Sequence, residues 1–442
     1  MTAEIVSNLL AARMQMAFTL GFHIILACFG VGLPVLMLFA EGQFLRTADA
    51  GWKILARRWS KAFAVLFGVG AVSGTVLSFE LGLLWPQFMG AFGAVIGLPF
   101  TLEGFAFFLE AIFVGIYLYG WDRLPPRVHW LTGFPIAIAG LASAWFVVTA
   151  NAWMNVPRGF QMADGKILDV DPFAAMLNPA TGPQTTHMIL AAYMVTGFVV
   201  ASVYAVARLR GKDTNYHRRA MALGVALGAI VTPVQIIVGD WAAKTVAQTQ
   251  PVKLAAMEGQ FRTEAWAPLR IGGLPDEEAR ITRYALEIPG GLSWLAYGDP
   301  NAVVQGLDDA PPQNQPPVAI VHLAFQLMVA IGAGLMALSL WAGWSVWRQR
   351  CLPESRVFLW ALAGAGPAVV AALEAGWVVT EVGRQPWIVQ GVMRTSEAVT
   401  AAPGIVWVLA ATLAIYVVLG VGAVLVLQLL ARAPFTEDHH GA

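Results

Sequence analysis

The sequence predicts an all-α polytopic membrane protein with nine transmembrane helices, which we expect to form two four-helix bundles plus one peripheral helix. Of the 442 residues, 58% are hydrophobic and only 12% are charged, a composition too apolar for a soluble protein of this length. Nine apolar stretches reach the roughly 20 residues that a helix needs to cross a bilayer. The formal net charge is zero, which excludes the basic footprint of a nucleic-acid-binding protein.

Polar or turn-rich breaks separate the apolar stretches. A short loop is expected at Trp85–Gly93 and a long one at Trp241–Pro317. The long loop opens with AAKTVAQTQPVKLAAMEGQF, which is typical of a short amphipathic helix broken at Pro251. The expected spans are 14–40, 56–82, 95–119, 129–150, 185–207, 220–240, 318–346, 357–380 and 402–430.

Lysine and arginine in the short loops predict the orientation, because these residues accumulate on the cytoplasmic side of a membrane. They are concentrated in the first, fifth and seventh loops and missing from the second. We therefore expect the N-terminus outside and the C-terminus inside. The chain then divides into residues 1–240 with six helices, an outer-side loop at 241–317, and residues 318–442 with three helices and a short cytoplasmic tail.

Several polar or sulfur-containing side chains occur at a similar depth, in the outer half of the predicted membrane region. A charged group at this depth is costly, so it is retained mainly where it has a function. Imidazole and thioether together form a haem iron pair, whereas a zinc site would not select methionine. The shared depth therefore favours haem centres held between helices. The layer comprises His23, Glu103, His187, Met328 and Glu374, with Glu110 about two turns further inward.

Each of these residues also has a structural interpretation. A single membrane histidine is more often a helix–helix hydrogen-bonding group, and a single methionine usually fills a core. Glu103 and Glu110 could equally form a proton relay or a paired structural charge. Arg384 and Trp387 could be interfacial anchors. A proton-coupled transporter or channel therefore remains the main alternative function, and a haem-free structural subunit is a second.

The chain resembles subunit I of the cytochrome bd-type quinol oxidases, in the short-loop group that includes the cyanide-insensitive oxidases. The resemblance spans nearly the whole chain and preserves the order of the motifs. The combination of GRQPW with a span that carries two glutamates is highly specific. The motifs are ARMQMAFTLGFHI around His23, LEGFAFFLEAIFVGIYLYGWDR around Glu103 and Glu110, ANAWMNVP, KLAAMEG around Lys253, and EAGWVVTEVGRQPW around Glu374.

The resemblance implies three haems and their protein ligands. His187 and Met328 match the axial pair of a low-spin haem b. His23 and Glu374 match the proximal ligands of two high-spin haems, one haem b and one haem d. The residues do not decide which of the two ligands holds haem d, and a third haem b in place of haem d is an open alternative.

The resemblance also implies roles around the haems. Quinol would be oxidised in the loop at 241–317. Glu103, Glu110 and Ser143 match positions near the site of oxygen reduction and on a proton route from the cytoplasm. Lys253 and Glu258 match positions for quinol. Arg384 and Trp387 match positions at the cofactor, where Arg384 would pair with a haem propionate.

The implied protein is the haem-containing subunit of a terminal oxidase in the bacterial inner membrane. It would oxidise ubiquinol outside, reduce O2 to water with cytoplasmic protons, and generate proton motive force without a pump. Its expected partners are subunit II and, in some forms, a small single-span subunit. Two positions depart from many members of the family: Gln326 stands in place of an arginine, and Val370 in place of a tryptophan.

Overall fold

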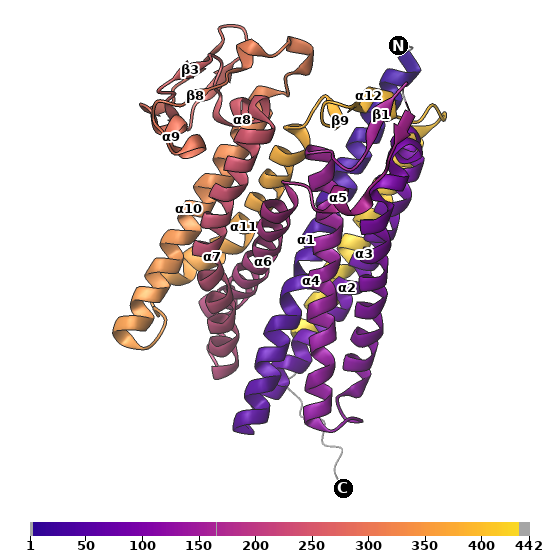
Figure 1. The fold of residues 1–442 in the computed structure, drawn as a ribbon. Coiled ribbons are helices and arrows are strands. Elements are labelled where there is room, and N and C mark those ends of the chain that lie inside the picture. The colour runs from indigo at the N-terminus through magenta and orange to yellow at the C-terminus, as the bar shows by residue number, and fades with distance from the viewer. Residues whose placement is uncertain (1–2, 165, 433–442) are drawn as a thin grey trace.

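The computed structural model describes residues 3–164 and 166–432. Within these ranges, nine helices are long and apolar enough to cross a membrane, as the hydropathy pattern predicts. Each helix covers all or nearly all of an expected span, and most helices extend beyond the predicted span ends (Figure 1). The helices are α1 (Ala3–Thr47), α2 (Ala50–Leu84), α3 (Pro86–Gly120), α4 (Pro126–Asn155), α6 (Thr181–Leu209), α7 (Asn215–Thr249), α10 (Val318–Gln349), α11 (Arg356–Val382) and α13 (Ile405–Arg432).

The long helices form two four-helix bundles and one peripheral helix, which confirms the expected architecture. In the first bundle, α1 packs against α2 and α4, and α3 packs against the same two helices. In the second, α6 and α10 each pack against α7 and α11, so that α6 and α10 lie on a diagonal. Helices α1 and α4 contact α6 and join the bundles. Within the described residues, α13 is peripheral, because it packs mainly against α1 and α2 (Figure 1).

The expected loop at Trp85–Gly93 is wrong. Trp85 alone separates α2 from α3, because Pro86 is the first residue of α3. A proline fits the first turn of a helix, where its missing N–H would have no partner. The weakly apolar residues that follow thus continue the helix beyond the predicted span. At the opposite end of α2, the side chain of Asp49 accepts a 2.8 Å hydrogen bond from the Gly51 N–H and caps the helix.

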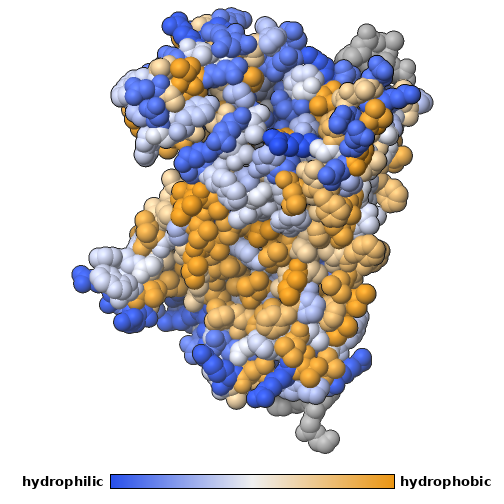
Figure 2. All heavy atoms as spheres, in the orientation of Figure 1, coloured by the Kyte–Doolittle hydropathy of each residue, from blue (hydrophilic) through white to orange (hydrophobic). Residues whose placement is uncertain are grey.

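Small residues let the helices of the second bundle approach closely, as is common for helix pairs in membranes. A Cβ atom on Gly197 of α6 would lie 2.5 Å from the Gly228 nitrogen of α7, so only glycine fits there. The main apolar core then extends from α1 across α6 to α11, with Cys28 and Phe358 fully buried. Figure 2 shows the complementary outer surface, an apolar band between two hydrophilic ends.

Short helices and two-stranded antiparallel sheets lie at the end of the bundles where α1 begins (Figure 1). The helix expected to break at Pro251 does so, because α7 ends at Thr249 and α8 begins at Pro251. Helix α8 packs against α7 and α10. The short elements are β1 (Gln161–Ala163), β2 (Lys166–Leu168), α5 (Pro172–Met176), α8 (Pro251–Glu258), β3 (Glu264–Ala265), β4 (Leu269–Ile271), β5 (Leu274–Asp276), β6 (Ile281–Arg283), β7 (Leu286–Ile288), α9 (Gly291–Tyr297), β8 (Val303–Val304), η1 (Leu307–Asp309), η2 (Pro312–Asn314), β9 (Trp387–Val389), β10 (Met393–Arg394) and α12 (Thr395–Ala398).

Candidate functional site

His187 and Met328 lie on the diagonal helices of the second bundle, and each packs against a glycine of a neighbouring helix. A Cβ atom on Gly239 of α7 would lie 3.5 Å from His187 Cε1. A Cβ atom on Gly376 of α11 would lie 3.1 Å from Met328 Sδ. The His187 Nδ1 atom is buried and has no hydrogen-bond partner. The imidazole therefore has a ring nitrogen without a partner, and both side chains lie against helix positions that carry no side chain.

His23 on α1 is held through one ring nitrogen. Its Nδ1 lies 2.9 Å from Ser73 Oγ on α2, and the Ser73 hydroxyl donates to the Gly70 carbonyl at 3.0 Å. Because that hydroxyl proton is already used, the His23 Nδ1–H group donates to Ser73 Oγ. Nε2 is then the ring nitrogen with a free lone pair. A Cβ atom on Gly74 would lie 2.9 Å from His23 Cε1. The serine and the glycine together set the ring's tautomer and provide its space.

Glu374 on α11 points across the boundary between the bundles. A Cβ atom on Gly21 of α1 would lie 3.0 Å from Glu374 Oε2, two residues before His23 in the chain. The other carboxylate oxygen, Oε1, is buried without a hydrogen-bond partner. The structure therefore brings Glu374 close to the part of α1 that carries His23, although the two residues lie 351 positions apart in the sequence.

The chemistry of these four side chains fits haem groups held between helices. A buried polar atom without a partner costs about 1–3 kcal/mol, so it indicates a missing ligand or water. Imidazole and thioether are established axial ligands of haem iron, and a carboxylate oxygen is a competent iron ligand. His187 Nδ1 and Glu374 Oε1 are such unpartnered atoms. The adjacent glycines provide space that a larger side chain would fill.

Glu103, Glu110 and Ser143 lie along the contact between α3 and α4. The Ser143 hydroxyl donates to Glu103 Oε1 at 3.2 Å. Glu110 is 5% exposed, and its Oε1 atom is buried without a partner. A Cβ atom on Gly140, one turn before Ser143 on α4, would lie 3.2 Å from Glu110 Oε1. The three residues expected to act together are thus adjacent along one helix pair.

Lys253 on α8 is buried at the end of the second bundle that carries the long loop. Its Nζ atom donates to Asn155 Oδ1 and to the Thr380 carbonyl, both at 3.1 Å. Burial lowers the pKa of Lys253 to about 7; the nearby Arg384 cation also lowers it and Glu381 opposes the shift. An ammonium group has three donors, so two fixed hydrogen bonds leave one N–H for another partner.

Arg384 lies in the turn after α11, within the GRQPW segment. It is 3% exposed, and its Nη2 atom donates to Glu381 Oε2 at 2.5 Å. Its Nε and Nη1 atoms are buried without partners. Glu381 also accepts a hydrogen bond from Asn151 of α4. The guanidinium group therefore retains donors for an anion, which is the property expected of a propionate partner.

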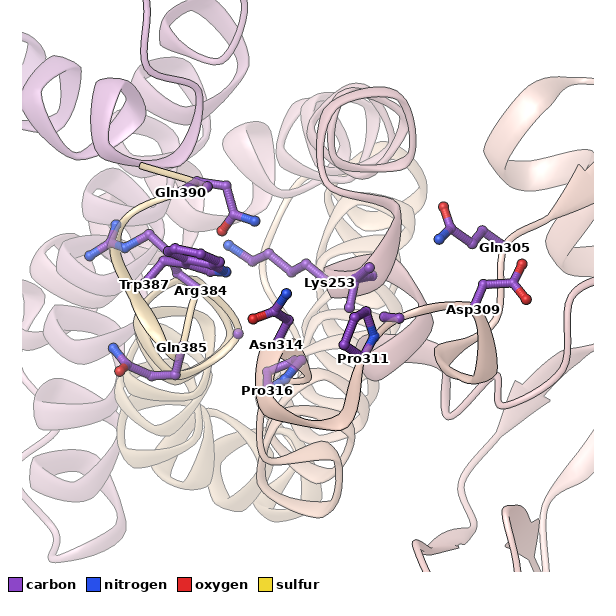
Figure 3. A pocket seen from close by; sticks show the side chains of 14 residues that line it. Lys253, Gln305, Asp309, Pro311, Asn314, Pro316, Arg384, Gln385, Trp387 and Gln390 are labelled. Atoms are coloured by element: carbon purple, nitrogen blue, oxygen red, sulfur yellow. The ribbon is translucent and has the colours of Figure 1, made fainter. Parts of the chain in front are cut away.

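Lys253, Arg384 and Trp387 line one cavity of about 300 Å³. Figure 3 shows Lys253 reaching from α8 toward Trp387 and Gln390, with Arg384 and Asn314 at the sides. The cavity lies between the long loop and the turn after α11. The structure thus places the expected quinol residue Lys253 and the expected cofactor residues Arg384 and Trp387 at the same cavity.

Glu258 is separated from Lys253. It lies five residues further along α8, which at about 100° per residue places it on a different helix face, and it does not line the cavity. Glu258 is 5% exposed and its Oε2 atom is buried without a partner. Burial raises the pKa of Glu258 to about 7, against the opposing effect of Arg270. The two expected quinol residues therefore lie on different sides of α8.

Gln326, one of the two departures from the family pattern, has a structural role. Its Nε2 atom donates to the Arg270 carbonyl at 3.0 Å, and its Oε1 atom accepts from the Gly272 N–H at 2.9 Å. The side chain thereby fixes the long loop to α10, two residues before Met328. Its amide both donates and accepts, which an arginine could not do.

Sequence reasoning missed the polar residues that hold the site in place. Ser73 and Glu381 were not singled out, and Asn151 and Asn155 were noted only as part of a motif. Asn155 donates to Asn151 and accepts from Lys253, so this pair connects α4 to α8. A signal was available, because two asparagines spaced four residues apart lie on one helix face and are unusual near the end of a membrane span.

Comparisons with known proteins show which family the chain resembles. The family model for cytochrome bd terminal oxidase subunit I matches residues 11–434. A Bacillus subtilis (strain 168) chain provisionally named cytochrome bd menaquinol oxidase subunit I is 39% identical, over 98% of both chains. The cytochrome bd-II ubiquinol oxidase subunit 1 of Escherichia coli (strain K12) is 28% identical over 88% of this chain and 89% of its own.

A solved structure gives the same result for the fold. The bd oxidase from Geobacillus thermodenitrificans matches with a TM-score of 0.90 and 41% sequence identity, covering 96% of this chain and 98% of the other. The match of both sequence and architecture extends over almost the entire length. The chain therefore belongs to the cytochrome bd terminal oxidase subunit I family.

Proposed function

We propose that this chain is the haem-carrying subunit of a quinol:dioxygen oxidoreductase and that it oxidises quinol at the cavity beside Lys253. The observation that carries the proposal is the placement of His187, whose Nδ1 atom has no partner, and Met328 on the diagonal helices of the second bundle. Helix α8, which carries Lys253, packs against α7 and α10 of that same bundle. A quinol at the cavity would therefore lie next to the helices that hold the electron acceptor.

The haem ligands follow from the donor set. His187 and Met328 would hold a low-spin haem b, while His23 through Nε2 and Glu374 would hold two high-spin haems, one b-type and one d-type. Bound haem supplies the electron transfer and the reduction of dioxygen to water. Arg384 would hold a haem propionate with the donors that Glu381 leaves free.

Lys253 and Glu258 would handle the quinol and its protons. Each quinol releases two electrons and two protons, and one dioxygen requires four of each, so two quinols are consumed per dioxygen. The free N–H of Lys253 would orient a quinol oxygen in the cavity. Glu258, with its pKa raised to about 7 by burial, is suited to accept a proton near neutral pH.

Glu110, Ser143 and Glu103 would deliver protons for water formation. They follow one another along α3 and α4, and Ser143 donates to Glu103. Glu110 lies nearer the end of α3 at Gly120, where Asp122 pairs with Arg57 at 2.8 Å. This Arg- and Lys-rich end would be cytoplasmic by the positive-inside rule, with the N-terminus outside. Protons consumed inside and released outside would generate proton motive force without a pump.

The setting is the bacterial cytoplasmic membrane, because the protein is a multi-pass bd oxidase subunit. Subunits I of this family pair with a subunit II, and we propose such a heterodimer here; a small single-span subunit would be an addition to it. The named relatives include both a menaquinol and a ubiquinol oxidase, so either quinone is a substrate to test, and the sequence pattern favours ubiquinol.

A reduced-minus-oxidised optical spectrum of the purified oxidase tests the proposal. Haem b bands with a far-red band of haem d are the expected result. Haem b bands alone would indicate that a third haem b is bound in place of haem d. A proton-coupled transporter would explain Glu103 and Glu110 but not Met328 on the helix diagonal to that of His187. A protein with no visible absorbance would contradict the oxidase and favour that alternative.

A further inference from the structure

An open groove of about 370 Å³ lies at the Arg- and Lys-rich end of the first bundle, far from the residues discussed above. It separates the last turns of α1 from the first turns of α4. Both helix ends lie where a membrane span meets the aqueous phase. The residues lining the groove are Gly42, Leu45 and Arg46 from α1 and Arg127, Trp130 and Leu131 from α4.

The two arginines of the groove have no carboxylate partner among residues 3–164 and 166–432. Arg46 donates only to the neutral Gln43 Oε1, at 2.8 Å, and Arg127 forms no ion pair there. Several other arginines at the same end are paired with carboxylates within the chain, as in Arg57–Asp122, Arg218–Asp213 and Arg219–Asp49, at 2.7–2.8 Å. The groove is thus a place where positive charge is left uncompensated, with no acidic residue in its lining.

The wall between the two arginines is apolar. Leu45 and Leu131 contribute aliphatic surface, and the Trp130 indole packs over Gly42, where a Cβ atom would lie 3.4 Å from Nε1. The Trp130 N–H is already used, because it donates to the Leu38 carbonyl at 2.9 Å. The indole therefore offers only its apolar ring to an occupant of the groove.

We propose that this groove binds an anionic phospholipid. Its phosphate would lie between Arg46 and Arg127, and an acyl chain would follow Leu45, Trp130 and Leu131. Charge complementarity selects an anionic headgroup, since a net-neutral lipid would leave the two cations uncompensated. The apolar wall selects a lipid over a free anion, which would have no use for it. Basic pockets between helices on the cytoplasmic side are a recognised site for anionic lipids.

The test uses the purified, delipidated oxidase with its partner subunit and measures binding of phosphatidylglycerol by native mass spectrometry. Each arginine near the membrane contributes about 1 kcal/mol to anionic lipid binding, which is about fivefold in affinity at 1.4 kcal/mol per tenfold. The single substitutions Arg46→Gln and Arg127→Gln should each weaken binding about fivefold, and the double variant about 30-fold. The haem spectrum of each variant shows whether the protein is intact.

The matched control is the double variant Arg210→Gln/Arg350→Gln, which removes the same charge from exposed positions at the same end of the helices. It should bind phosphatidylglycerol as the unsubstituted protein does. Three results would overturn the proposal: equal loss in the control and the groove variant, equal binding of phosphatidylcholine and phosphatidylglycerol, or displacement of the lipid by an equal concentration of inorganic phosphate. The last would identify a site for a free anion.

Discussion

Substitution of Lys253 by methionine tests the quinol site directly. Methionine keeps much of the length of the side chain and removes its charge and its three N–H donors. Lys253 is expected to use two of these donors on Asn155 Oδ1 and the Thr380 carbonyl, both at 3.1 Å, and the third on quinol. We therefore expect Lys253→Met to lower kcat/KM for quinol and to leave later electron transfer intact.

The size of the effect follows from the lost hydrogen bond. A hydrogen bond from a charged donor contributes about 1.5–3 kcal/mol, and each 1.36 kcal/mol is tenfold in rate. The expected decrease in kcat/KM is therefore roughly 10- to 150-fold. The cation is present below its pKa of about 7 and is lost as the pH rises through that value. Lys253→Arg should keep the charge and remove the decrease in quinol oxidation at alkaline pH.

The assay compares quinol-dependent and artificial-donor-dependent oxygen uptake in the same membranes. Lys244→Met is the matched control, because Lys244 lies on the adjoining helix α7 and pairs with Asp240 at 2.6 Å, away from the cavity. The control should retain full activity with both donors. If Lys253→Met oxidises quinol normally, or loses activity equally with both donors, Lys253 does not bind quinol.

The remaining predictions concern the haem ligands and the second quinol residue. His187→Ala or Met328→Ala should remove the low-spin haem absorbance and largely preserve the high-spin bands; unchanged spectra in both would refute the assignment. Ser73→Ala should weaken retention of the high-spin haem held by His23 about 10- to 100-fold. The measurement is the loss of this haem on dilution, with the low-spin haem as the internal reference. Equal retention would show that the serine does not support a ligand. Quinol oxidation should be bell-shaped in pH around 7, and Glu258→Gln should abolish the rise on its acidic side, where the wild-type carboxyl group ionises, while the Lys253-dependent decrease on the alkaline side remains. A rise that persists in this variant would assign the proton acceptor elsewhere.

Hydropathy and residue identity predicted most of the helices, because a span must be apolar over a length set by the bilayer. The same reasoning failed at Trp85–Gly93, where proline and glycine indicated a loop but Pro86 begins α3. Helix ends outside the bilayer follow capping and proline placement and are not constrained by hydropathy. The candidate ligands were identified from residue type, depth and a family resemblance, so their chemistry did not require a structure.

By itself, the sequence determined that this is a nine-span membrane protein, and it predicted imidazole, thioether and carboxylate groups at one depth. Only the tertiary structure decided which of those groups meet. It placed α6 and α10 on a diagonal, brought Glu374 to the part of α1 that carries His23, and separated Glu258 from Lys253. The physical reason is that depth along a helix is encoded locally, at a fixed rise per residue. The direction in which a side chain points depends on helix rotation and partner choice, which glycine contacts distributed across the whole chain establish.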